Sequence, residues 1–484
     1  RGDRGQTPSP AVSIIGLGAS GYAAARLALE QGETVHASDT STDARTAARA
    51  RDLEAMGARV DLGHHDADRI AAAGLVVVSP GIPPDAPVLR ELRSRGVRWV
   101  SEPDFAVRFH SGSLIAVTGT NGKTTTSTLT AHLLEAAGIS VALGGNVGAN
   151  LAPPASELAL GGSDSDWWVL EMSSFQLADV SEFSPDIGVV TNLAPDHLDR
   201  YPDTAAYFGD KARLFLNARS SSRWVLNGDD PATIELAGDA AGTRYLFAES
   251  PPESFGSKEG NLPEPSAYLR EGVLTLRLEP RLRGAPAEES LVARGDLRLL
   301  GDHNVQNALA ASLTARLAGA GPDGIRAGLR SFQPLPHRLA PVAEVGGVLW
   351  VDDSKATNVA AARSAVASLD RPLVLLLGGR DKGEDFRPLA ETLGGRVRAA
   401  IVYGEAGPRI ERELAQALTE TVATPIPVLV TVDGGFDRAV LAAGSLARAG
   451  DIVLLAPACS SYDEFEDYEA RGRRFAQLAR EGVG

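Results

Sequence analysis

Short runs of apolar residues alternate with Ala-, Leu- and Arg-rich stretches along most of the 484-residue chain. This alternation is typical of β-α-β units, in which helices cover the faces of a parallel sheet. The pattern forms three blocks, with boundaries expected near residues 102 and 334. The sequence therefore predicts an α/β fold of three domains, 1–102, 103–334 and 335–484, each built on a mostly parallel sheet.

The apolar runs also locate individual strands. We expect strands at residues 11–15, 34–39, 75–78, 114–118, 168–170, 187–191, 224–227, 348–352, 372–377, 399–403, 427–432 and 452–456. Residues 249–267 have the Pro-, Ser- and Glu-rich composition of a loop. The later stretches GVLTLRLEP and DLRLLGDH predict two strands of an antiparallel flap. The central block is thus expected to carry an insertion around 249–290.

Composition excludes several classes of protein. The formal net charge of −15 argues against a general nucleic-acid binder or a protein that adheres to anionic membranes. No apolar run approaches the roughly 18 residues of a membrane span, and the opening residues lack the core of a signal peptide. The one cysteine, Cys459, excludes a disulfide framework and is expected to be a buried thiol. These features predict a cytoplasmic protein.

Lysine is rare in this chain. Five lysines stand against 42 arginines, so arginine serves as the general surface cation. A lysine that persists is a candidate for a compact charge, or for an amine that can lose its proton and react. We interpret Lys258, in the loop-like stretch, as ordinary residue usage. The other four lie in motifs and are Lys123, Lys211, Lys355 and Lys382.

Two glycine-rich segments each join a predicted strand to a predicted helix. The first, Gly16-x-Gly18-x-x-Gly21 with Asp39 at the end of the next strand, is typical of dinucleotide binding, although the same glycines also serve a purely steric turn. The chain offers no hydride-transfer site, so another nucleotide is an open alternative. The second segment, Gly119–Thr124, is a stronger signal of nucleotide binding than the first. Backbone N–H groups there can bind phosphates, Lys123 can neutralise them and the Thr124 hydroxyl can ligate Mg²⁺.

Polar clusters follow the next two strands of the central block. Glu171 ends one strand, and Asp196 and His197 follow another. Carboxyl ends of parallel strands meet at one edge, so these clusters predict a metal and substrate site near the glycine loop. Lys211 lies fourteen residues after His197 on a predicted helix, where the alternative is a solvated lysine that pairs with Asp210.

Loops at predicted strand ends in the third block carry four further polar motifs. They are Pro336-His337-Arg338, Asp352–Asn358, Gly378–Gly383 and Ala458–Asp463. Parallel sheets bind ligands at this edge, so the third block is expected to contribute to a ligand site.

These motifs resemble those of the Mur ligases, the ATP-dependent amide-forming enzymes of peptidoglycan synthesis. The resemblance rests on Gly119–Thr124, Asp196–Arg200 and Lys211, and extends over nearly the whole chain. Four further motifs resemble the branch that adds D-glutamate, namely 171–176, 335–338, 353–358 and 457–463. The chain departs from the family pattern at Tyr462, at Ala340 and in the insertion.

The resemblance implies the fold and the role of each matched position. It implies a Rossmann-like N-terminal domain for the UDP-substrate, a P-loop ATPase-like central domain for ATP and a Rossmann-like C-terminal domain for the amino acid. The implied UDP-substrate residues are Ala19, Ser20, Gly21, Asp39, Thr40, Ser79, Asn146, Ser173 and Gln176. The implied ATP residues are Asn121, Gly122, Lys123, Thr124, Thr125, Asn304, Arg338 and Asp353. D-glutamate would meet Lys355, Thr357, Lys382, Ser461 and Tyr462.

The resemblance also implies the chemistry. Magnesium would be held by Thr124, Glu171, His197 and a carbamylated Lys211, and catalysis would involve Lys123, Glu171, His197 and Lys211. The implied reaction joins D-glutamate to UDP-N-acetylmuramoyl-L-alanine through an acyl phosphate, giving ADP and phosphate, in a monomeric enzyme. One alternative is another Mur-type or folylpolyglutamate-type amide ligase. An alternative of another class is a non-catalytic nucleotide-binding regulator.

Overall fold

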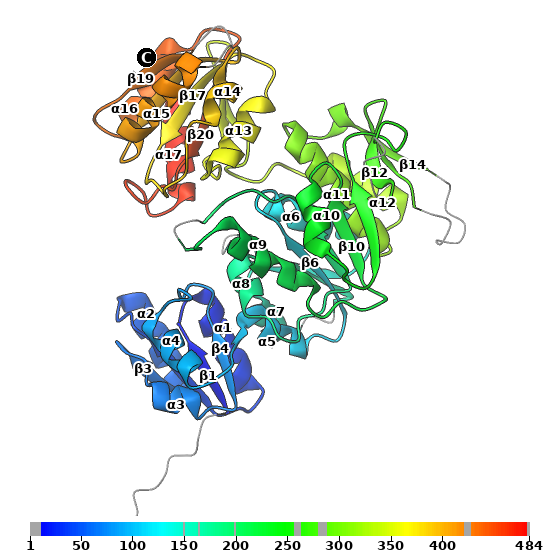
Figure 1. The fold of residues 1–484 in the computed structure, drawn as a ribbon, viewed down its shortest axis with the longest axis vertical. Helices are drawn as coiled ribbons and strands as arrows, with labels where there is room; N and C mark the ends of the chain where they lie inside the picture. Colours follow the sequence, from blue (N-terminus) through cyan, green and yellow to red (C-terminus); the bar gives the residue numbers. More distant parts are fainter. Residues whose placement is uncertain are drawn as a thin grey trace, which may run out of the picture.

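The computed structural model describes residues 11–148, 151–162, 165–197, 200–255, 263–278, 288–420 and 427–481. Its strands form three separate sheets, which follow one another along the chain. Figure 1 shows them as three bodies in a row, with the blue N-terminal body at one end and the orange and red C-terminal body at the other. The predicted α/β fold with three mostly parallel sheets is confirmed. The exact domain boundaries at 102 and 334 stay predictions.

The N-terminal sheet is parallel and has the order β3-β2-β1-β4-β5. Its strands are β1 (Val12–Ile15), β2 (Val35–Asp39), β3 (Arg59–Leu62), β4 (Leu75–Val78) and β5 (Val100–Ser101). Its helices are α1 (Ala19–Glu30), α2 (Ala44–Ala55), α3 (Ala67–Ala71) and α4 (Pro87–Ser94). The strand order reverses direction between β1 and β4, and ligands of such sheets bind outside the carboxyl ends at that point.

The central sheet has nine strands in the order β14-β13-β12-β11-β10-β9-β6-β8-β7. The strands are β6 (Ser113–Thr118), β7 (Val141–Gly145), β8 (Trp167–Glu171), β9 (Ile187–Val190), β10 (Arg223–Asn227), β11 (Thr243–Phe247), β12 (Pro265–Arg270), β13 (Val273–Leu276) and β14 (Glu289–Ala293). The helices are α5 (Glu102–Ala106), η1 (Val107–Phe109), α6 (Lys123–Ala136), α7 (Ala155–Leu160), α8 (Ser174–Ala178), α9 (Thr204–Ala212), η2 (Arg213–Phe215), α10 (Pro231–Ala237), η3 (Arg294–Asp296), α11 (Asp302–Leu317) and α12 (Pro322–Ser331).

An antiparallel flap extends the central sheet, but one of its predicted strands is wrong. β13 lies within the predicted stretch GVLTLRLEP and pairs with β12 and β14 in antiparallel register. The stretch DLRLLGDH is not a strand, because it runs from η3 into the start of α11. Its leucines pack against two domains instead: Leu297 is buried in the core of the central domain, and the partly buried Leu300 packs against that of the C-terminal domain. Residues 256–262, which include Lys258, and 279–287 of the predicted insertion lie outside the described residues.

The C-terminal sheet has six strands in the order β15-β16-β20-β17-β18-β19. The strands are β15 (Ala340–Val345), β16 (Val348–Asp352), β17 (Leu373–Gly378), β18 (Val397–Tyr403), β19 (Val428–Thr431) and β20 (Ile452–Ala458). The helices are α13 (Val359–Ala367), α14 (Leu389–Leu393), α15 (Gly407–Glu420), α16 (Phe436–Leu446) and α17 (Tyr468–Glu481). Among the described strands of this sheet, only the edge strand β15 runs antiparallel to its neighbour. Among the described helices, none combines the length and the apolar character needed to cross a membrane.

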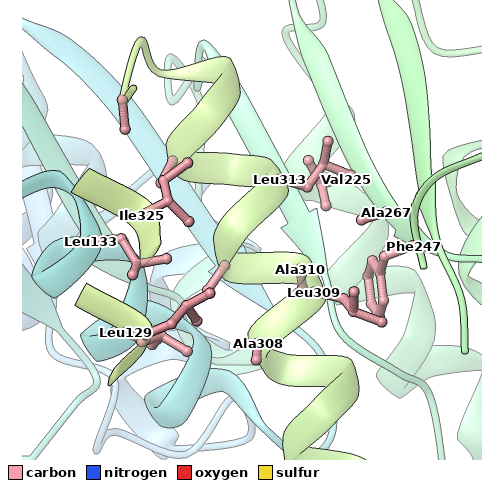
Figure 2. Packing of buried hydrophobic residues seen from close by; sticks show 14 of the residues in the cluster. Leu129, Leu133, Val225, Phe247, Ala267, Ala308, Leu309, Ala310, Leu313 and Ile325 are labelled. Atoms are coloured by element: carbon pink, nitrogen blue, oxygen red, sulfur yellow. The ribbon is translucent and has the colours of Figure 1, made fainter. Parts of the chain in front are cut away.

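Helix α11 holds the core of the central domain together. Figure 2 shows Leu309 and Leu313 of α11 between the sheet strands on one side and α6 and α12 on the other. Twelve of the sixteen residues of α11 are buried, so the helix is a central layer rather than a surface element. Because α6 begins at the glycine loop, this packing fixes the position of that loop.

Replacing Leu313 by alanine is expected to lower the free energy of unfolding by about 2–5 kcal/mol, since the fully buried side chain leaves a cavity. Denaturant unfolding of the purified chain measures this change. The matched control is Leu441→Ala on α16, where the side chain is 45% exposed and the expected change is small. Equal effects of the two substitutions would contradict the packing described here.

Candidate functional site

The loop between β6 and α6 requires glycine at two positions. Gly119 and Gly122 have φ angles of +137° and +80°. A Cβ atom at Gly119 would lie 2.0 Å from Thr191 Oγ1, and one at Gly122 would lie 2.3 Å from Asn307 Oδ1. The loop therefore packs against the end of β9 and against α11 so closely that no side chain fits. Its backbone N–H groups and the N-terminus of α6 form an anion-binding arrangement.

Lys123 lies inside this loop. Its Nζ donates hydrogen bonds to the carbonyl oxygens of Gly119 at 3.0 Å and Thr120 at 2.8 Å. Burial lowers the pKa of Lys123, while the Glu171 and Asp196 carboxylates oppose that change. A compact cation is thus fixed where the outer phosphates of a nucleotide would meet the loop.

A cavity of ≈ 250 Å³ opens beside the loop, and four lysines line it. We call it the lysine cavity, after Lys123, Lys211, Lys355 and Lys382. Two of these residues come from the central domain and two from the C-terminal domain. The lysines that the Arg-rich composition singled out are therefore brought together in space, from positions as far apart as 123 and 382.

Glu171 supplies a carboxylate to the same cavity. Its Oε1 accepts a hydrogen bond from Asn146 Nδ2 at 3.1 Å, whereas its Oε2 is buried without a hydrogen-bond partner. A buried carboxylate oxygen without a partner is costly unless a cation binds it. All four residues predicted for magnesium line the cavity: Thr124, Glu171, His197 and Lys211. The described residues contain no cluster of three or more His, Cys, Asp or Glu side chains placed to hold a metal. The four predicted magnesium residues instead combine a carboxylate and an imidazole with a hydroxyl and an amine.

Aromatic rings hold His197 at the cavity wall. Its backbone has a φ of +55°, which is uncommon for a residue other than glycine. Its ring lies 5.1 Å from that of Phe175 and 6.0 Å from that of Tyr207, measured between centroids. Phe175 and Tyr207 also line the cavity. These two aromatic residues were assigned no role from the sequence, because an aromatic residue in a short helical segment is usually part of the hydrophobic core.

Lys211 is buried on α9, with 1% of its surface exposed. Its Nζ donates to the Gly119 carbonyl at 2.8 Å and lies 4.6 Å from the Tyr207 ring centroid. Burial, reinforced by Lys123, lowers the pKa of Lys211 well below its ordinary value. Lys211 is therefore buried rather than solvated, and the hydrogen bond of its Nζ goes to the Gly119 carbonyl.

The predicted amino-acid residues divide into two groups. Lys355, Thr357 and Lys382 line the lysine cavity. The Lys355 Nζ lies 3.9 Å from the ring centroid of Tyr468, and burial, with Arg338 nearby, lowers the pKa of Lys355 to about 8. Ser461 and Tyr462 follow β20 and are not among the residues that line the lysine cavity. Ser461 is buried and Tyr462 is 61% exposed.

A second cavity of ≈ 260 Å³ adjoins the first and shares Asn121, Gly122, Arg338 and Lys355 with it. The predicted ATP residues Thr125, Asn304 and Asp353 line it as well. Burial raises the pKa of Asp353 to about 7, and its Oδ1 accepts a hydrogen bond from the Leu339 N–H at 3.2 Å.

Sequence reasoning missed His303 in this second cavity. Its Nδ1 is buried without a hydrogen-bond partner, and desolvation lowers the pKa of the ring to about 4. His303 directly precedes Asn304, a predicted ATP residue, and this position could have indicated that it lies in the same cavity.

The N-terminal glycine loop lies away from both cavities. A Cβ at Gly21 would stand 1.8 Å from the Gly16 carbonyl oxygen, so the glycine permits close packing of strand and helix. Both carboxylate oxygens of Asp39 accept backbone N–H groups, from Leu17 at 2.6 Å and Ser41 at 2.8 Å. Asp39 therefore shapes the loop.

The other predicted UDP-substrate residues fall into two places. Ala19 and Ser20 begin α1, while Thr40 and Ser79 follow β2 and β4, the strands on either side of β1. Of the remaining three, Asn146 and Ser173 line the lysine cavity. Gln176 does not, because its Oε1 accepts the Ser173 N–H at 2.9 Å in a capping box that begins α8.

The phosphate-type loop, the central parallel sheet and the paired cavities define a nucleotide-binding α/β protein of three domains. Three family models match consecutive parts of the chain: "Mur ligase MurD-like, N-terminal domain" over residues 10–101, "Mur ligase middle domain" over 117–315 and "Mur ligase, glutamate ligase domain" over 337–459. The chain belongs to the Mur ligase family, whose members use ATP.

Similar proteins from several bacteria carry one name, UDP-N-acetylmuramoylalanine–D-glutamate ligase. The protein of Anaeromyxobacter dehalogenans is 42% identical, with 97% of each chain covered. That of Acidobacterium capsulatum is 39% identical, with 96% of this chain and 95% of the relative covered. Both alignments span all three domains.

Solved structures with similar folds are more distant in sequence. A pseudomurein peptide ligase type C of Methanothermus fervidus gives a TM-score of 0.60 at 19% identity, covering 97% of this chain and 99% of that one. UDP-N-acetylmuramate-alanine ligase of Thermotoga maritima gives a TM-score of 0.56 at 19% identity, covering 98% and 99%. At these identities the likeness concerns the fold alone.

Proposed function

We propose that this chain joins D-glutamate to UDP-N-acetylmuramoyl-L-alanine, with ATP converted to ADP and phosphate, in peptidoglycan precursor synthesis. The observation that carries the proposal is the lysine cavity, where four scarce lysines from two domains meet beside the phosphate loop. Relatives of 35–42% identity over nearly the full length are named for this activity. We further propose that the enzyme acts as a cytoplasmic monomer on these small molecules, without nucleic acid or membrane.

The chemistry follows from the substrates. A carboxylate is a poor electrophile, so the γ-phosphoryl group of ATP is transferred to it first, which gives an acyl phosphate and ADP. The neutral amine of D-glutamate then attacks the acyl carbon, and inorganic phosphate leaves. Charge that develops on the transferring oxygens is stabilised by Lys123 and the loop N–H groups. The cavity lies between domains, which favours exclusion of water from the acyl phosphate.

The adjoining cavity fits the nucleoside part of ATP. Asn304 and Arg338 offer donors there, and Asp353 offers a carboxyl group. Both cavities meet at Asn121 and Gly122 in the phosphate loop. A triphosphate can therefore reach from the adjoining cavity into the lysine cavity along the loop.

The residues around Glu171 fit a magnesium ion. The unpartnered Glu171 Oε2 is an oxygen ligand of the kind that Mg²⁺ prefers. Thr124, His197 and a carbamylated Lys211 would complete the protein ligands. When bound, the ion would neutralise charge on the phosphate oxygens.

We propose positions for the other substrates from the predicted residues that line the cavities. Asn146, Ser173 and His197 would meet the muramoyl-alanine end, and Lys355, Thr357 and Lys382 the amino acid. The UDP end would reach the N-terminal loop at Ala19–Gly21, with Asp39, Thr40 and Ser79 beside it. Gln176, Ser461 and Tyr462 stay predictions, with Gln176 acting through the cap that positions Ser173.

Replacing Lys382 by alanine is expected to raise KM for D-glutamate at least about tenfold, because a charge-assisted contact to a carboxylate is lost. KM for ATP should change much less. Initial rates of phosphate release at varied concentrations of each substrate measure both constants. The control Arg387→Ala removes an exposed cation of the same domain and should change neither. A variant impaired only in its use of ATP would contradict the assignment.

One assay tests the function as a whole. Phosphate release is measured with ATP and with each pair of a UDP-muramoyl precursor and an amino acid. Release that requires both UDP-N-acetylmuramoyl-L-alanine and D-glutamate supports the proposal. Release with another pair would instead identify a different amide ligase of this family. Nucleotide binding without release under any pair would identify a non-catalytic regulator.

A further inference from the structure

Asp196 has so far been given no role in the reaction. It lies on the loop after β9 in the central domain and is 7% exposed. Its carboxylate faces two groups of the C-terminal domain. Oδ2 accepts a hydrogen bond from Asn358 Nδ2 at 3.0 Å, and Oδ1 lies 3.9 Å from Lys382 Nζ. A buried acid of one domain thus meets an amide and a cation of the other.

Asn358 is held in one orientation by its own helix. Its Oδ1 accepts the Ala361 N–H at 2.7 Å and so caps the N-terminus of α13. The amide nitrogen must then point away from the helix, toward Asp196. Asn358 is only 4% exposed, so water does not replace this contact. The side-chain oxygen of Asn358 thus caps the helix, while its side-chain nitrogen makes the contact between domains.

We propose that Asp196 is a positioning residue that docks the C-terminal domain on the central domain through Asn358 and orients Lys382 toward the lysine cavity. The domain docking is independent of the substrate. The orientation of Lys382 for a substrate carboxylate rests on the proposed function. A hydrogen bond to a buried ionised group is stronger than one between neutral groups, and an exposed pair would contribute little. Both side chains of the pair are largely buried, at 9% exposure for Asp196 and 18% for Lys382.

The substitution Asn358→Asp tests the docking directly. Aspartate caps a helix as well as asparagine does, so α13 keeps its N-cap. Two carboxylates would then face each other at hydrogen-bond distance and repel. We expect a larger radius of gyration in small-angle X-ray scattering of the full chain, and a KM for D-glutamate raised about tenfold or more.

The reciprocal exchange Asp196→Asn with Asn358→Asp supplies the second test. The amide and the carboxylate then change places, so the hydrogen bond can form with donor and acceptor reversed. We expect the double variant to recover most of the compactness that Asn358→Asp loses, whereas the D-glutamate KM stays raised because Asp196→Asn removes the carboxylate beside Lys382. A structural role confined to the cap would give no such recovery. The control Gln416→Glu adds the same charge on the exposed face of α15 and should change neither readout.

The outcomes separate this proposal from the proposed function. The scattering measurement uses no substrate, so it tests the docking whatever amino acid the enzyme accepts. Unchanged scattering and KM in Asn358→Asp would overturn the proposal, and so would a double variant no more compact than the single one. If Asn358→Asp does not fold, a folded double variant supports the contact and an unfolded one overturns it.

Discussion

Replacing Lys123 by alanine is expected to lower the rate of phosphate release by about two to three orders of magnitude, equivalent to about 3–4 kcal/mol of transition-state stabilisation. The Nζ of Lys123 is fixed by the carbonyls of Gly119 and Thr120, so its charge is already in place when phosphoryl transfer begins. Single-turnover phosphate release at saturating ATP measures the effect.

A folding control accompanies this prediction. The variant should unfold at nearly the same denaturant concentration as the parent, because the lysine contacts the loop and not the apolar core. Arg473→Ala on α17 removes a cation that is 63% exposed and should leave the rate unchanged. Near-normal turnover of a folded Lys123→Ala enzyme would show that this loop is not the triphosphate site.

Lys211→Arg is expected to be nearly inactive, although it keeps a cation at the same position. We predict that Lys211 is carbamylated in the active enzyme, and a carbamate forms only from a neutral amine. Burial and the neighbouring Lys123 both lower the pKa of Lys211, which favours that neutral form at ordinary pH. A guanidinium stays protonated and cannot form the adduct. Its larger head would also have to fit a site with 1% exposure.

Chemical rescue separates a missing carbamate from a damaged fold. Lys211→Ala should regain part of the lost activity when formate or acetate is added, because a small carboxylate can replace the two anionic oxygens. The same additions should not restore Lys211→Arg, in which the side chain fills the space. A fully active Lys211→Arg enzyme would exclude the carbamate.

Most of the fold could be predicted because its central strands are continuous apolar runs. Strands such as β8 and β17 are buried along their whole length, so their sequence pattern is strong. The edge strands β3 and β15 are partly exposed and carry mixed residues, and no pattern marked them. The stretch from Leu297 to Leu300 looked like a strand because its leucines pack against two domains, which no local pattern reveals.

The sequence could indicate candidate residues of the site but not how they lie relative to one another. The four lysines could be singled out because lysine is rare in this chain, and in the structure all four line one cavity. Nothing local shows that Asn358 reaches Asp196 across 162 positions of sequence. In the same way Gln176 reads as a polar residue in a motif, while its amide is engaged in capping α8. Contacts between domains depend on the fold as a whole. The same holds for the use of a polar side chain to cap a helix.

We propose that Lys355 contacts an anionic substrate, and its lowered pKa would then make substrate binding a proton-coupled event. With a pKa of about 8, this amine exchanges its proton with solvent in the mildly alkaline range. A bound carboxylate or phosphate favours the ammonium form and raises the pKa, so the bound state holds more protons than the free state. By linkage, the affinity of such a site would be greatest below pH 8 and would be lost as the pH rises from there toward the bound-state value. The affinity for substrate would thereby depend on the alkalinity of the surroundings.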